Sequence, residues 1–441
     1  MKKWICSFLI LLCLLSMTPL CMAVPEAEGE SPAEVPEVKA QNVLLISLET
    51  GAVIYEKNAD ERIFPASTTK IMTLILALEH CRDLEAGVTV SETYDDDLIF
   101  GSSGINITEG EVFTVADLLY AVAIASANDA ANVLAEYVGG SIENFVQMMN
   151  DKAAAIGAKN TQFKNVHGLP DDEHYTTAAD MALFMQYGMG IDLFQTLMST
   201  YARTIPATNK SSRRLISTTN SLISQVSANY YKYACGGKTG TTTAAGYNLV
   251  SWAKKNEKSF LCVAMNADKA ASLTNPIFSD SKNLYEWAFE NFSLQQIVNT
   301  KDPQIEIKVN LSAEKDYVVL CAEENLSAIL PNNTDLSTLD YTKDVPEEVL
   351  APIAIGDEIG TLTISKDGVV YGKTKLVAGE DISRSTVLYY LYCIKQFFSN
   401  LWVQIVAAIL LILLIIYIII MIRRNRRRRR RVVRLKPRIR Y

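Results

Sequence analysis

The chain has 441 residues, of which 49% are hydrophobic and 21% are charged, and its formal net charge at pH 7 is −7. These ordinary fractions exclude a disordered, collagen-like or disulfide-scaffold protein, and the length indicates two or three domains. Twelve of the 42 basic residues lie between Arg423 and Arg440, and removing them together with Lys2 and Lys3 leaves a net charge of −21 for the rest. Such an acidic body argues against a nucleic-acid binder, whose folded domain normally has a basic face.

The first 40 residues have the features of a signal peptide followed by a linker. Two lysines precede the apolar run Trp4–Met17, and Cys21-Met22-Ala23 places small residues at positions −3 and −1 of a cleavage site. We therefore predict a signal peptide over residues 1–23. An N-terminal membrane anchor is the alternative, although the apolar run is short for one. Residues 24–40 are rich in Pro, Glu and Ala and are predicted to form an acidic, extended linker.

Residues 41–293 are predicted to form one α/β domain. At both ends of this range apolar and polar residues alternate as they do in strands. In residues 67–190, between the ends, the apolar residues recur with helical periodicity. Because strands occur at both ends, we expect a sheet assembled from both. The predicted elements are the strands Asn42–Ser47 and Ala52–Lys57 joined by the turn Glu49–Gly51, the apolar helical runs Val115–Val138 and Ile142–Ile156, the strands Tyr247–Trp252 and Phe260–Asn266, and a helix at Ser279–Phe292.

The remainder of the chain is predicted to form a small β-rich domain and a membrane anchor. Residues 296–380 contain short alternating segments separated by turn residues. The aromatic-rich residues 386–399 are expected to lie at the membrane surface. The uncharged segment Leu401–Ile422 extends over about 33 Å at about 1.5 Å per residue, enough to cross a bilayer. The predicted strands of the β-rich domain are Ile305–Leu311, Tyr317–Ala322, Glu358–Ile364 and Val369–Lys375.

The basic tail after the apolar segment predicts its orientation. Residues 423–441 include six consecutive arginines, and the positive-inside rule places such a tail in the cytoplasm. The acidic body is then outside, so we predict a bacterial cell-membrane protein with one span and an extracytoplasmic body. A nucleic-acid or lipid-headgroup patch is the alternative interpretation of the arginine run.

Neither a disulfide framework nor a metal site is indicated. Three of the eight cysteines fall in the predicted signal peptide, and the remaining five are an odd number without CxxC spacing, so we expect buried thiols. With three histidines in the chain, no zinc site and no cofactor are predicted. We expect His167 to be a positioning or core residue and His174 to pack locally. The five cysteines are Cys81, Cys235, Cys262, Cys321 and Cys393.

Three short motifs in the predicted α/β domain are suited to catalysis. Ser67-Thr68-Thr69-Lys70 is an SxxK arrangement, in which residues i and i+3 share one face of a helix, so that the lysine amine can approach the serine hydroxyl. Ser126-Ala127-Asn128 lies at the end of an apolar helix. Lys238-Thr239-Gly240 opens a returning strand, where the lysine can hold a substrate carboxylate and the glycine allows the substrate backbone to approach closely.

Copies of the first two motifs elsewhere in the chain are predicted to be coincidental. Pro65-Ala66 places Ser67 just past a strand-to-helix turn, and the other two motifs follow it in order. The second SxN copy lies nine residues before Lys238, which leaves no room for a helical lobe between them. The coincidental matches are Ser251–Lys254, Ser279–Lys282, Ser312–Lys315 and Ser227–Asn229.

In order and context the three motifs resemble those of the low-molecular-mass penicillin-binding proteins, the serine-type D-alanyl-D-alanine carboxypeptidases. The resemblance covers residues 41 to 380, approximately. It implies a penicillin-binding transpeptidase/β-lactamase-like domain, an antiparallel sheet flanked by a helical lobe, followed by the small β-rich domain. The similar blocks are Phe64–Thr73, Leu118–Tyr120, Ser126–Ala131, Phe163–Leu169, His174–Thr177, Gly237–Thr242, Ala245–Val250, and Ala351–Gly356 to Leu376–Ala378.

The resemblance implies three catalytic residues. Ser67 is expected to be the acyl-accepting nucleophile and Lys70 the base that activates it. Ser126 is expected to pass the proton to the leaving amine. A positive charge on Lys238 near Lys70 would lower the pKa of Lys70 by like-charge repulsion and leave a neutral amine that can accept a proton.

The resemblance also implies how the substrate is held. Asn128 is expected to bind the substrate amide, and Lys238 and Thr239 the terminal carboxylate, with Gly240 allowing the close approach. Backbone N–H groups of Ser67 and Thr241 are expected to form the oxyanion hole.

Two features depart from the family pattern. The family often has an Arg directly before the Phe-x-Asp that opens the last helix, where it helps to hold the carboxylate. Ile277 takes that place, so the cation is missing or is supplied by another residue, for which Lys269 is the nearest candidate in sequence. Alternatively, Ile277 packs in the core. The family usually ends in an amphipathic surface helix, whereas this chain adds a span and a basic tail.

The predicted function is removal of the terminal D-alanine from peptidoglycan pentapeptides through an acyl-enzyme, with β-lactams acylating Ser67 as substrate mimics. One alternative is a class A-like β-lactamase, but no Glu-x-x-Leu-Asn block lies between Asn128 and Lys238 to activate a deacylating water. The other is a non-catalytic cell-wall-binding protein, which the departure at Ile277 makes conceivable. The predicted partners are thus the pentapeptide, β-lactams and a membrane, and no nucleic acid.

Overall fold

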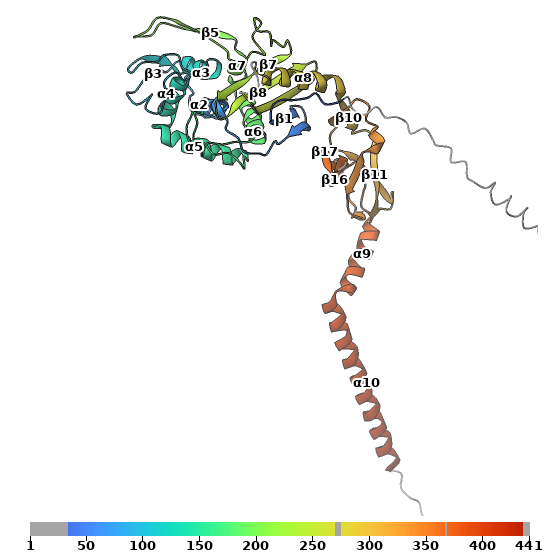
Figure 1. Cartoon of the computed structure of the whole chain (residues 1–441). Coiled ribbons are helices and arrows are strands. Elements are labelled where there is room, and N and C mark those ends of the chain that lie inside the picture. The colour runs from blue at the N-terminus through green and yellow to red at the C-terminus, as the bar shows by residue number, and fades with distance from the viewer. Residues whose placement is uncertain (1–33, 270–274, 367, 435–441) are drawn as a thin grey trace, which may run out of the picture. The chain divides into compact units, whose positions relative to one another are not determined.

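A computed structural model describes residues 34–269, 275–366 and 368–434 (Figure 1). The predicted signal peptide, residues 24–33 of the predicted linker and residues 435–441 of the tail lie outside the described residues. The chain divides into two compact units. One comprises the described residues up to Gln295 together with Ile329–Asp335, and the other comprises Gln296–Ala328 and the described residues from Leu336 onward.

The first unit is built on a five-stranded antiparallel sheet with the strand order β2-β1-β9-β8-β7. The N-terminal strand β1 pairs with β9, so the predicted sheet from both ends of the segment is confirmed. Strand β7 is at the edge and carries Lys238-Thr239-Gly240. The bounds are β1 Asn42–Ser47, β2 Val53–Lys57, β7 Ala234–Thr242, β8 Gly246–Lys255 and β9 Lys258–Ala267.

Both faces of this sheet are buried, each in its own hydrophobic core. All six residues of β1 are buried, and they alternate between the two faces. Leu44 and Ile46 pack in the core shared with the helical lobe, whereas Val43 and Leu45 pack in the core shared with helix α8 (Ile277–Asn291). The sheet is thereby covered on two sides, and β2 and β7 are its edge strands (Figure 1).

The helical lobe begins with the short 3₁₀ helix η1 (Ala66–Thr69), which leads directly into α2 (Lys70–His80). Side chains cap several of its helices; for example, the Thr114 hydroxyl accepts a hydrogen bond from the N–H of Asp117 at the start of α3. Gly157 adopts φ +98° and ends α5, a conformation that glycine reaches without steric penalty. The remaining helices are α3 Val115–Ile124, α4 Asn128–Gly139, α5 Ile142–Ile156, α6 Ala178–Met189 and α7 Phe194–Ser199.

The structure corrects three expectations for this unit. The apolar run Val115–Val138 is two helices, because Ser126 adopts φ +58° and an α-helix cannot continue through such a residue. The strand that carries Lys238 begins four residues earlier, at Ala234. The segment expected to be helical also contains two short paired strands, and a second pair follows it. These strands are β3 Gly87–Thr89, β4 Val112–Thr114, β5 Ala202–Ile205 and β6 Arg214–Ser217.

The second unit contains a six-stranded sheet with the order β14-β16-β17-β12-β11-β15. The four predicted strands are confirmed, and β14 and β15 are additional. Strands β10 (Phe292–Val298) and β13 (Leu326–Pro331) form a separate two-stranded sheet, and η2 (Leu336–Thr338) is a short 3₁₀ helix. The bounds are β11 Pro303–Asn310, β12 Tyr317–Ala322, β14 Asp340–Asp344, β15 Glu348–Leu350, β16 Glu358–Lys366 and β17 Val369–Ala378.

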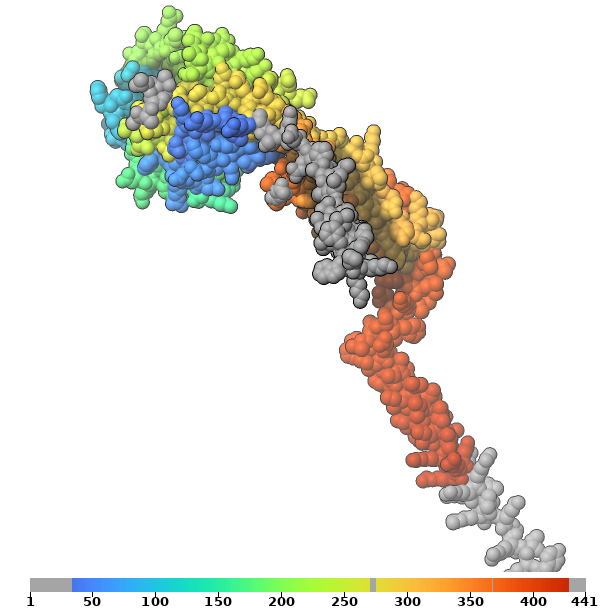
Figure 2. All heavy atoms as spheres, turned by 45° about the vertical axis from the view of Figure 1, so that its right-hand side comes forward, coloured from blue at the N-terminus to red at the C-terminus, as the bar shows by residue number. Residues whose placement is uncertain are grey.

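Two helices follow this sheet. Helix α9 (Thr386–Ser399) coincides with the predicted surface segment, and α10 (Leu401–Arg434) contains the predicted span. Its part Leu401–Arg427 is long and apolar enough to cross a membrane, by length and composition. The large apolar side chains of this part are exposed, as the space-filling view shows for α10 (Figure 2). Exposed aliphatic surface of this extent is typical of a helix that lies in lipid.

Candidate active site

The serine and lysine of the SxxK motif face each other at the start of α2. Lys70 is fully buried and Ser67 is half-buried. The Lys70 Nζ lies 3.1 Å from the Ser67 Oγ, 2.6 Å from the amide oxygen of Asn128 and 2.7 Å from the carbonyl oxygen of His167. The 3₁₀ geometry of η1 places residues i and i+3 on one side, as the spacing requires. This arrangement directs the Lys70 nitrogen at the serine hydroxyl.

The segment that bears Ser67 is held against the sheet by two contacts. A Cβ at Gly240 would lie 2.9 Å from both the Pro65 carbonyl oxygen and the Ser67 nitrogen, so β7 approaches η1 as closely as only a glycine permits. The side-chain amide of Asn248 on β8 donates to the carbonyls of Phe64 and Pro65, each at 3.0 Å. Sequence analysis singled out Gly240 but gave Asn248 no role of its own.

The second and third motifs meet through one hydrogen bond. Ser126 lies between α3 and α4, and its left-handed backbone turns its hydroxyl toward β7. The Lys238 Nζ donates to the Ser126 Oγ at 2.8 Å and to the Thr239 carbonyl at 3.0 Å. Asn128 begins α4 and contacts Lys70. Side chains of all three motifs therefore converge on one place at the edge of the sheet.

Both lysines of the site have pKa values below the ordinary value of a lysine. Burial, followed by the positive charge of Lys238, lowers the pKa of Lys70 well below its ordinary value, and the Asp129 carboxylate opposes this effect. Burial lowers the pKa of Lys238 to about 7. No carboxylate in the described part of the chain forms an ion pair with Lys70; Asp129 instead accepts hydrogen bonds from the backbone N–H groups of Ile105 and Ile107. A neutral Lys70 amine is therefore favoured.

His167 supports Lys70 through its backbone. Its Nδ1 accepts a hydrogen bond from the Leu169 N–H at 3.2 Å, so Nε2 carries the ring proton and donates to Asp97 at 3.0 Å. Burial lowers the pKa of His167, and the bond to Asp97 opposes this effect. The ring makes no hydrogen bond to Ser67 or Lys70, which agrees with the expectation of a positioning residue.

His174 contacts the nucleophile helix directly, which sequence analysis did not predict. Its Nδ1 accepts a hydrogen bond from the Lys164 N–H at 3.2 Å, so its Nε2–H donates to the Thr69 hydroxyl at 2.9 Å. Burial lowers the pKa of His174 to about 3. Thr69 directly precedes Lys70, so the hydrogen bond from neutral His174 stabilises the helical turn that positions Lys70.

Thr239 and Thr241 lie on the open edge of β7. The Thr239 hydroxyl is 2.5 Å from the hydroxyl of Thr219, a residue that follows β6 and whose N–H donates to the Ile124 carbonyl. Thr241 is exposed one residue beyond Gly240. Thr219 was not predicted, because no motif marks it. The hydroxyls of Thr239 and Thr241 are therefore polar groups on the edge of β7, close in sequence to Lys238.

Several other residues considered in the sequence lie away from this site. Ser251, a coincidental SxxK match, is buried and hydrogen-bonded to Tyr285. Ile277 is fully buried in the core beneath α8, whereas Lys269 is exposed beyond the end of β9. The five cysteines after the predicted signal peptide are free thiols, of which Cys393 is exposed. Within the described residues no group of three or more His, Cys, Asp or Glu is placed to hold a metal ion.

Comparison with known protein families finds two matching family models. A family model described as D-alanyl-D-alanine carboxypeptidase matches residues 29–269. A second model, described as Penicillin-binding protein 5, C-terminal domain, matches residues 292–384.

Individual relatives are similar over most of their length. The D-alanyl-D-alanine carboxypeptidase DacF of Bacillus subtilis is 31% identical over 395 residues, which are 89% of this chain and 97% of the relative. DacC of Escherichia coli is 30% identical, over 85% of this chain and 89% of the relative. Among solved structures, penicillin binding protein 5 from Haemophilus influenzae is similar with a TM-score of 0.64 and 28% identity, covering 79% of this chain and 99% of that chain. The predicted fold class is confirmed.

Proposed function

The chain belongs to the D-alanyl-D-alanine carboxypeptidase family, and we propose that Ser67 is the nucleophile with which it releases the terminal D-alanine of peptidoglycan pentapeptides. The chain is thus a hydrolase that acts on D-alanyl-D-alanine termini. The single observation that carries the assignment of Ser67 is its 3.1 Å contact with a fully buried lysine whose pKa is well below the ordinary value. A lysine in this state can take the proton of a serine hydroxyl.

Acylation begins with transfer of the Ser67 hydroxyl proton to the neutral Lys70 amine. The serine oxygen then attacks the carbonyl carbon of the penultimate D-alanine, and a tetrahedral oxyanion forms. Backbone N–H groups of Ser67 and Thr241 are proposed to hold this oxyanion, and the close approach at Gly240 supports the pairing. General-base help contributes roughly 10²–10⁴ in rate, and one oxyanion donor about 10²–10³.

Collapse of the tetrahedral intermediate requires a proton on the leaving amine of D-alanine. Ser126 is proposed to deliver it, because its hydroxyl is hydrogen-bonded to Lys238 at 2.8 Å. The proton that Lys70 took from Ser67 is proposed to replace the one that Ser126 gives up, which leaves Lys70 neutral again; Lys70 contacts Asn128, two residues after Ser126. The C–N bond then breaks, and water hydrolyses the resulting acyl-enzyme.

The terminal carboxylate of the peptide is proposed to bind Lys238 and Thr239. A substrate carboxylate beside Lys238 would favour the charged form of that lysine and offset its burial. The Asn128 side-chain amide is proposed to hold the peptide amide upstream. Since β7 is an edge strand, an extended peptide can add to it as a further strand. β-Lactams are proposed to enter in the same pose and acylate Ser67.

The compartment and the roles of the two units are also proposals. Residues 41–293 are proposed as the catalytic domain and residues 296–380 as a β-rich domain that lies between it and the anchor in the sequence. Leu401–Ile422 is proposed to cross the bacterial cell membrane once. The basic residues that follow support a cytoplasmic tail and an extracytoplasmic catalytic domain.

The test is release of D-alanine from a synthetic pentapeptide by the full-length protein in detergent micelles. We expect stoichiometric D-alanine release and a covalent adduct with labelled penicillin at Ser67, mapped by mass spectrometry of tryptic peptides. An adduct at another serine, or release of D-alanine without any adduct, would refute the proposed nucleophile.

A further inference from the structure

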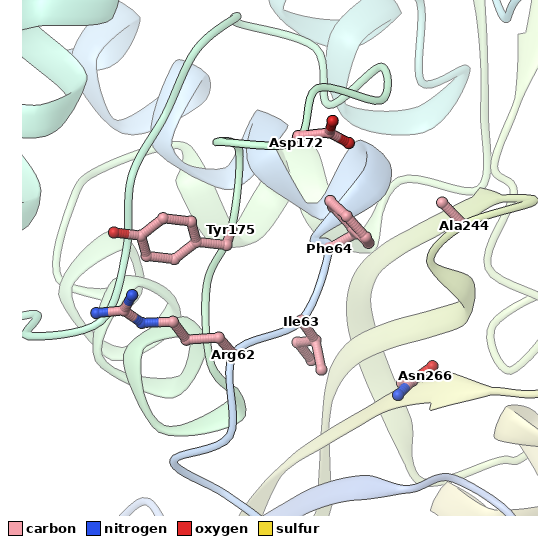
Figure 3. Close-up of a pocket in the computed structure, with 7 residues that line it drawn as sticks. All are labelled: Arg62, Ile63, Phe64, Asp172, Tyr175, Ala244 and Asn266. Carbon is pink, nitrogen blue, oxygen red and sulfur yellow. The ribbon is translucent and has the colours of Figure 1, made fainter.

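Three asparagines connect the first strand of the catalytic unit to the segment that leads to Ser67, and we call them the asparagine network. Asn42 begins β1, Asn248 lies on β8, and Asn266 lies near the end of β9. Asn42 and Asn248 are fully buried, and Asn266 is half-buried. Asn266 borders the same cavity as Phe64, three residues before the nucleophile (Figure 3). Buried amides require hydrogen-bond partners, and these partners show what the network holds.

The first part of the network holds the end of the nucleophile segment. The side-chain nitrogen of Asn248 donates to the carbonyl oxygens of Phe64 and Pro65, each at 3.0 Å. Its side-chain oxygen accepts a hydrogen bond from the backbone N–H of Asn266 at 2.7 Å. A carbonyl oxygen only accepts and a backbone N–H only donates, so the Asn248 amide has one possible orientation. A carboxylate in its place could not donate to the two carbonyls.

The second part of the network holds the beginning of the same segment. The side-chain nitrogen of Asn42 donates to the Asn58 carbonyl at 2.9 Å and to the Glu61 carboxylate at 3.2 Å. Its side-chain oxygen accepts a hydrogen bond from the side-chain nitrogen of Asn266 at 3.2 Å. Residues 58–65 connect β2 to η1. The network therefore holds this connection near both of its ends, and Asn266 joins the two points.

Asn266 reaches both partners from a bulge in β9. Where β8 pairs with β9, the single residue Asn248 lies opposite two residues of β9, Met265 and Asn266. Asn266 adopts φ +57°, a left-handed conformation in which asparagine is enriched and which most other side chains disfavour. In this conformation its backbone N–H meets Asn248 and its side chain meets Asn42. The left-handed backbone of Asn266 is thus part of the network.

The held segment ends in a strained residue directly before the nucleophile. Ala66 adopts φ +48°, which brings its Cβ too close to the following carbonyl and is rare for an alanine. The hydrogen bond from Asn248 to the Pro65 carbonyl fixes the peptide unit that enters Ala66. A shift of this peptide unit would move the Ser67 hydroxyl relative to the Lys70 nitrogen, from which it is 3.1 Å away.

We propose that the asparagine network positions Ser67 for acylation, and that Asn266 is a positioning residue that acts through Asn248. The inference rests on the proposed function, because it takes Ser67 as the nucleophile. Loss of the left-handed backbone at Asn266 withdraws its N–H from Asn248, whose amide is then no longer held on its two carbonyl partners. Attack depends steeply on the position of the nucleophile, so acylation slows while binding of the ligand is unchanged.

The test compares Asn266→Gly with Asn266→Ala in the full-length protein in detergent micelles. Both variants lose the side-chain amide, but glycine adopts a positive φ readily and alanine does not. Time courses of labelling at several concentrations of a fluorescent penicillin give the acylation rate constant and, separately, the dissociation constant of the complex that precedes it. We expect the acylation rate constant to fall by about threefold in Asn266→Gly and about 30-fold in Asn266→Ala, with unchanged dissociation constants.

Asn256 provides the matched control. It lies in the turn at the other end of β8 and β9, is exposed, and adopts the same φ of +57°. Asn256→Gly and Asn256→Ala should acylate at equal rates, even if their Tm values differ. All labelling is done well below the lowest Tm, and Asn266→Ser takes the place of Asn266→Ala if the alanine variant does not fold.

The outcomes separate the network from the proposed function. Faster acylation in Asn266→Gly than in Asn266→Ala, without such a difference at Asn256, supports the positioning role. Equal rate constants in the two Asn266 variants, a change confined to the dissociation constant, or the same difference at Asn256 would overturn it. A wild-type protein that forms no adduct at Ser67 would instead overturn the proposed function on which the inference rests.

Discussion

The side-chain nitrogen of Lys238 lies 2.8 Å from the hydroxyl of Ser126, a residue 112 positions earlier in the chain. This contact joins the edge of the sheet to the turn between two helices, and both residues are buried. Burial brings the pKa of Lys238 to about 7, and its positive charge helps to lower the pKa of Lys70. Lys238, the residue proposed to hold the substrate carboxylate, thus also lowers the pKa of Lys70, the proposed base.

The two lysines predict a bell-shaped pH profile for kcat/KM on peptides with a free carboxylate. On the acid side the rate falls because Lys70 becomes protonated and no longer accepts a proton. Above about pH 7 it falls because Lys238 in the free enzyme loses its charge. Since the lysines interact, the two apparent pKa values belong to the pair.

An amidated peptide serves as the control for this profile. It has no terminal carboxylate, so its kcat/KM should decline less on the alkaline side. In the kcat profile of the free-carboxylate peptide the alkaline limb should move to higher pH, because the bound carboxylate favours charged Lys238. Identical alkaline limbs for both peptides would show that Lys238 does not hold the carboxylate.

Ser67→Ala should abolish penicillin labelling and lower D-alanine release by about 10³-fold or more, because no other hydroxyl contacts Lys70 among the described residues. The Tm should remain near that of the wild type, since the side chain is half-buried and small. Ser279→Ala is the matched control from a coincidental SxxK copy, and it should keep full activity. Labelling that persists in Ser67→Ala and disappears in Ser279→Ala would reverse the assignment.

Gly240→Ala should lower the rate of acylation by about 100-fold or more. The added methyl group would lie 2.9 Å from the backbone of both Pro65 and Ser67, so β7 must move away from the nucleophile and its oxyanion donors. The rate of labelling with a fluorescent penicillin measures the effect. Gly87→Ala is the control, because its methyl would meet the Val112 side chain at an ordinary 3.5 Å. Equal labelling rates in the two variants would contradict the close approach.

The buried His174 should make the fold sensitive to acid. Its pKa is about 3 in the folded state against 6.5 ordinarily, so the unfolded state binds a proton that the folded state does not. Stability is therefore complete above pH 6.5 and is lost as the pH falls toward 3, by about 1.4 kcal/mol per pH unit within that window.

His174→Gln tests this acid sensitivity, because a glutamine can still donate to Thr69 but does not titrate. We expect the Tm of the wild type to fall more steeply between pH 6.5 and 4 than the Tm of His174→Gln. The measurement is thermal unfolding followed by circular dichroism at each pH. Parallel curves for the two proteins would contradict the contribution of His174.

Ile277→Arg should destabilise the first unit rather than improve the carboxylate site. Ile277 is fully buried in the core with α8, and an arginine there would bury an unpaired charge at a cost of about 3 kcal/mol or more. Thermal unfolding should show the loss, while the kcat/KM ratio of free-carboxylate to amidated peptide should not rise.

Lys269→Ala then tests the other candidate cation. If Lys269 supplies the charge, this variant should lose activity on the free-carboxylate peptide and not on the amidated one. A folded, stable Ile277→Arg protein with a raised ratio would restore the interpretation in which the missing arginine limits activity.

Most of the fold could be predicted from the local pattern of apolar and polar residues. The bounds of Ile142–Ile156 and Asn42–Ser47 coincide with α5 and β1, because the period of the apolar residues and the residues at each end are properties of a short segment. The motifs Ser67–Lys70, Ser126–Asn128 and Lys238–Gly240 could be selected by their order, their spacing and the turn at Pro65-Ala66. Their side chains then met as expected, since the family resemblance carried their spatial arrangement with it.

What only the tertiary structure decided depends on partners that are far apart in the sequence. His174 and Thr69 are 105 residues apart, and Asn248 and Phe64 are 184 apart, so no periodicity marks either hydrogen bond. The left-handed backbone of Ser126 breaks an apolar run that reads locally as one helix. Ile277 is buried because α8 packs its apolar face on the sheet. Sequence by itself determined which residue types are available for the chemistry, whereas packing determined which of them touch, because close contact, burial and the resulting pKa values exist only after the chain has folded.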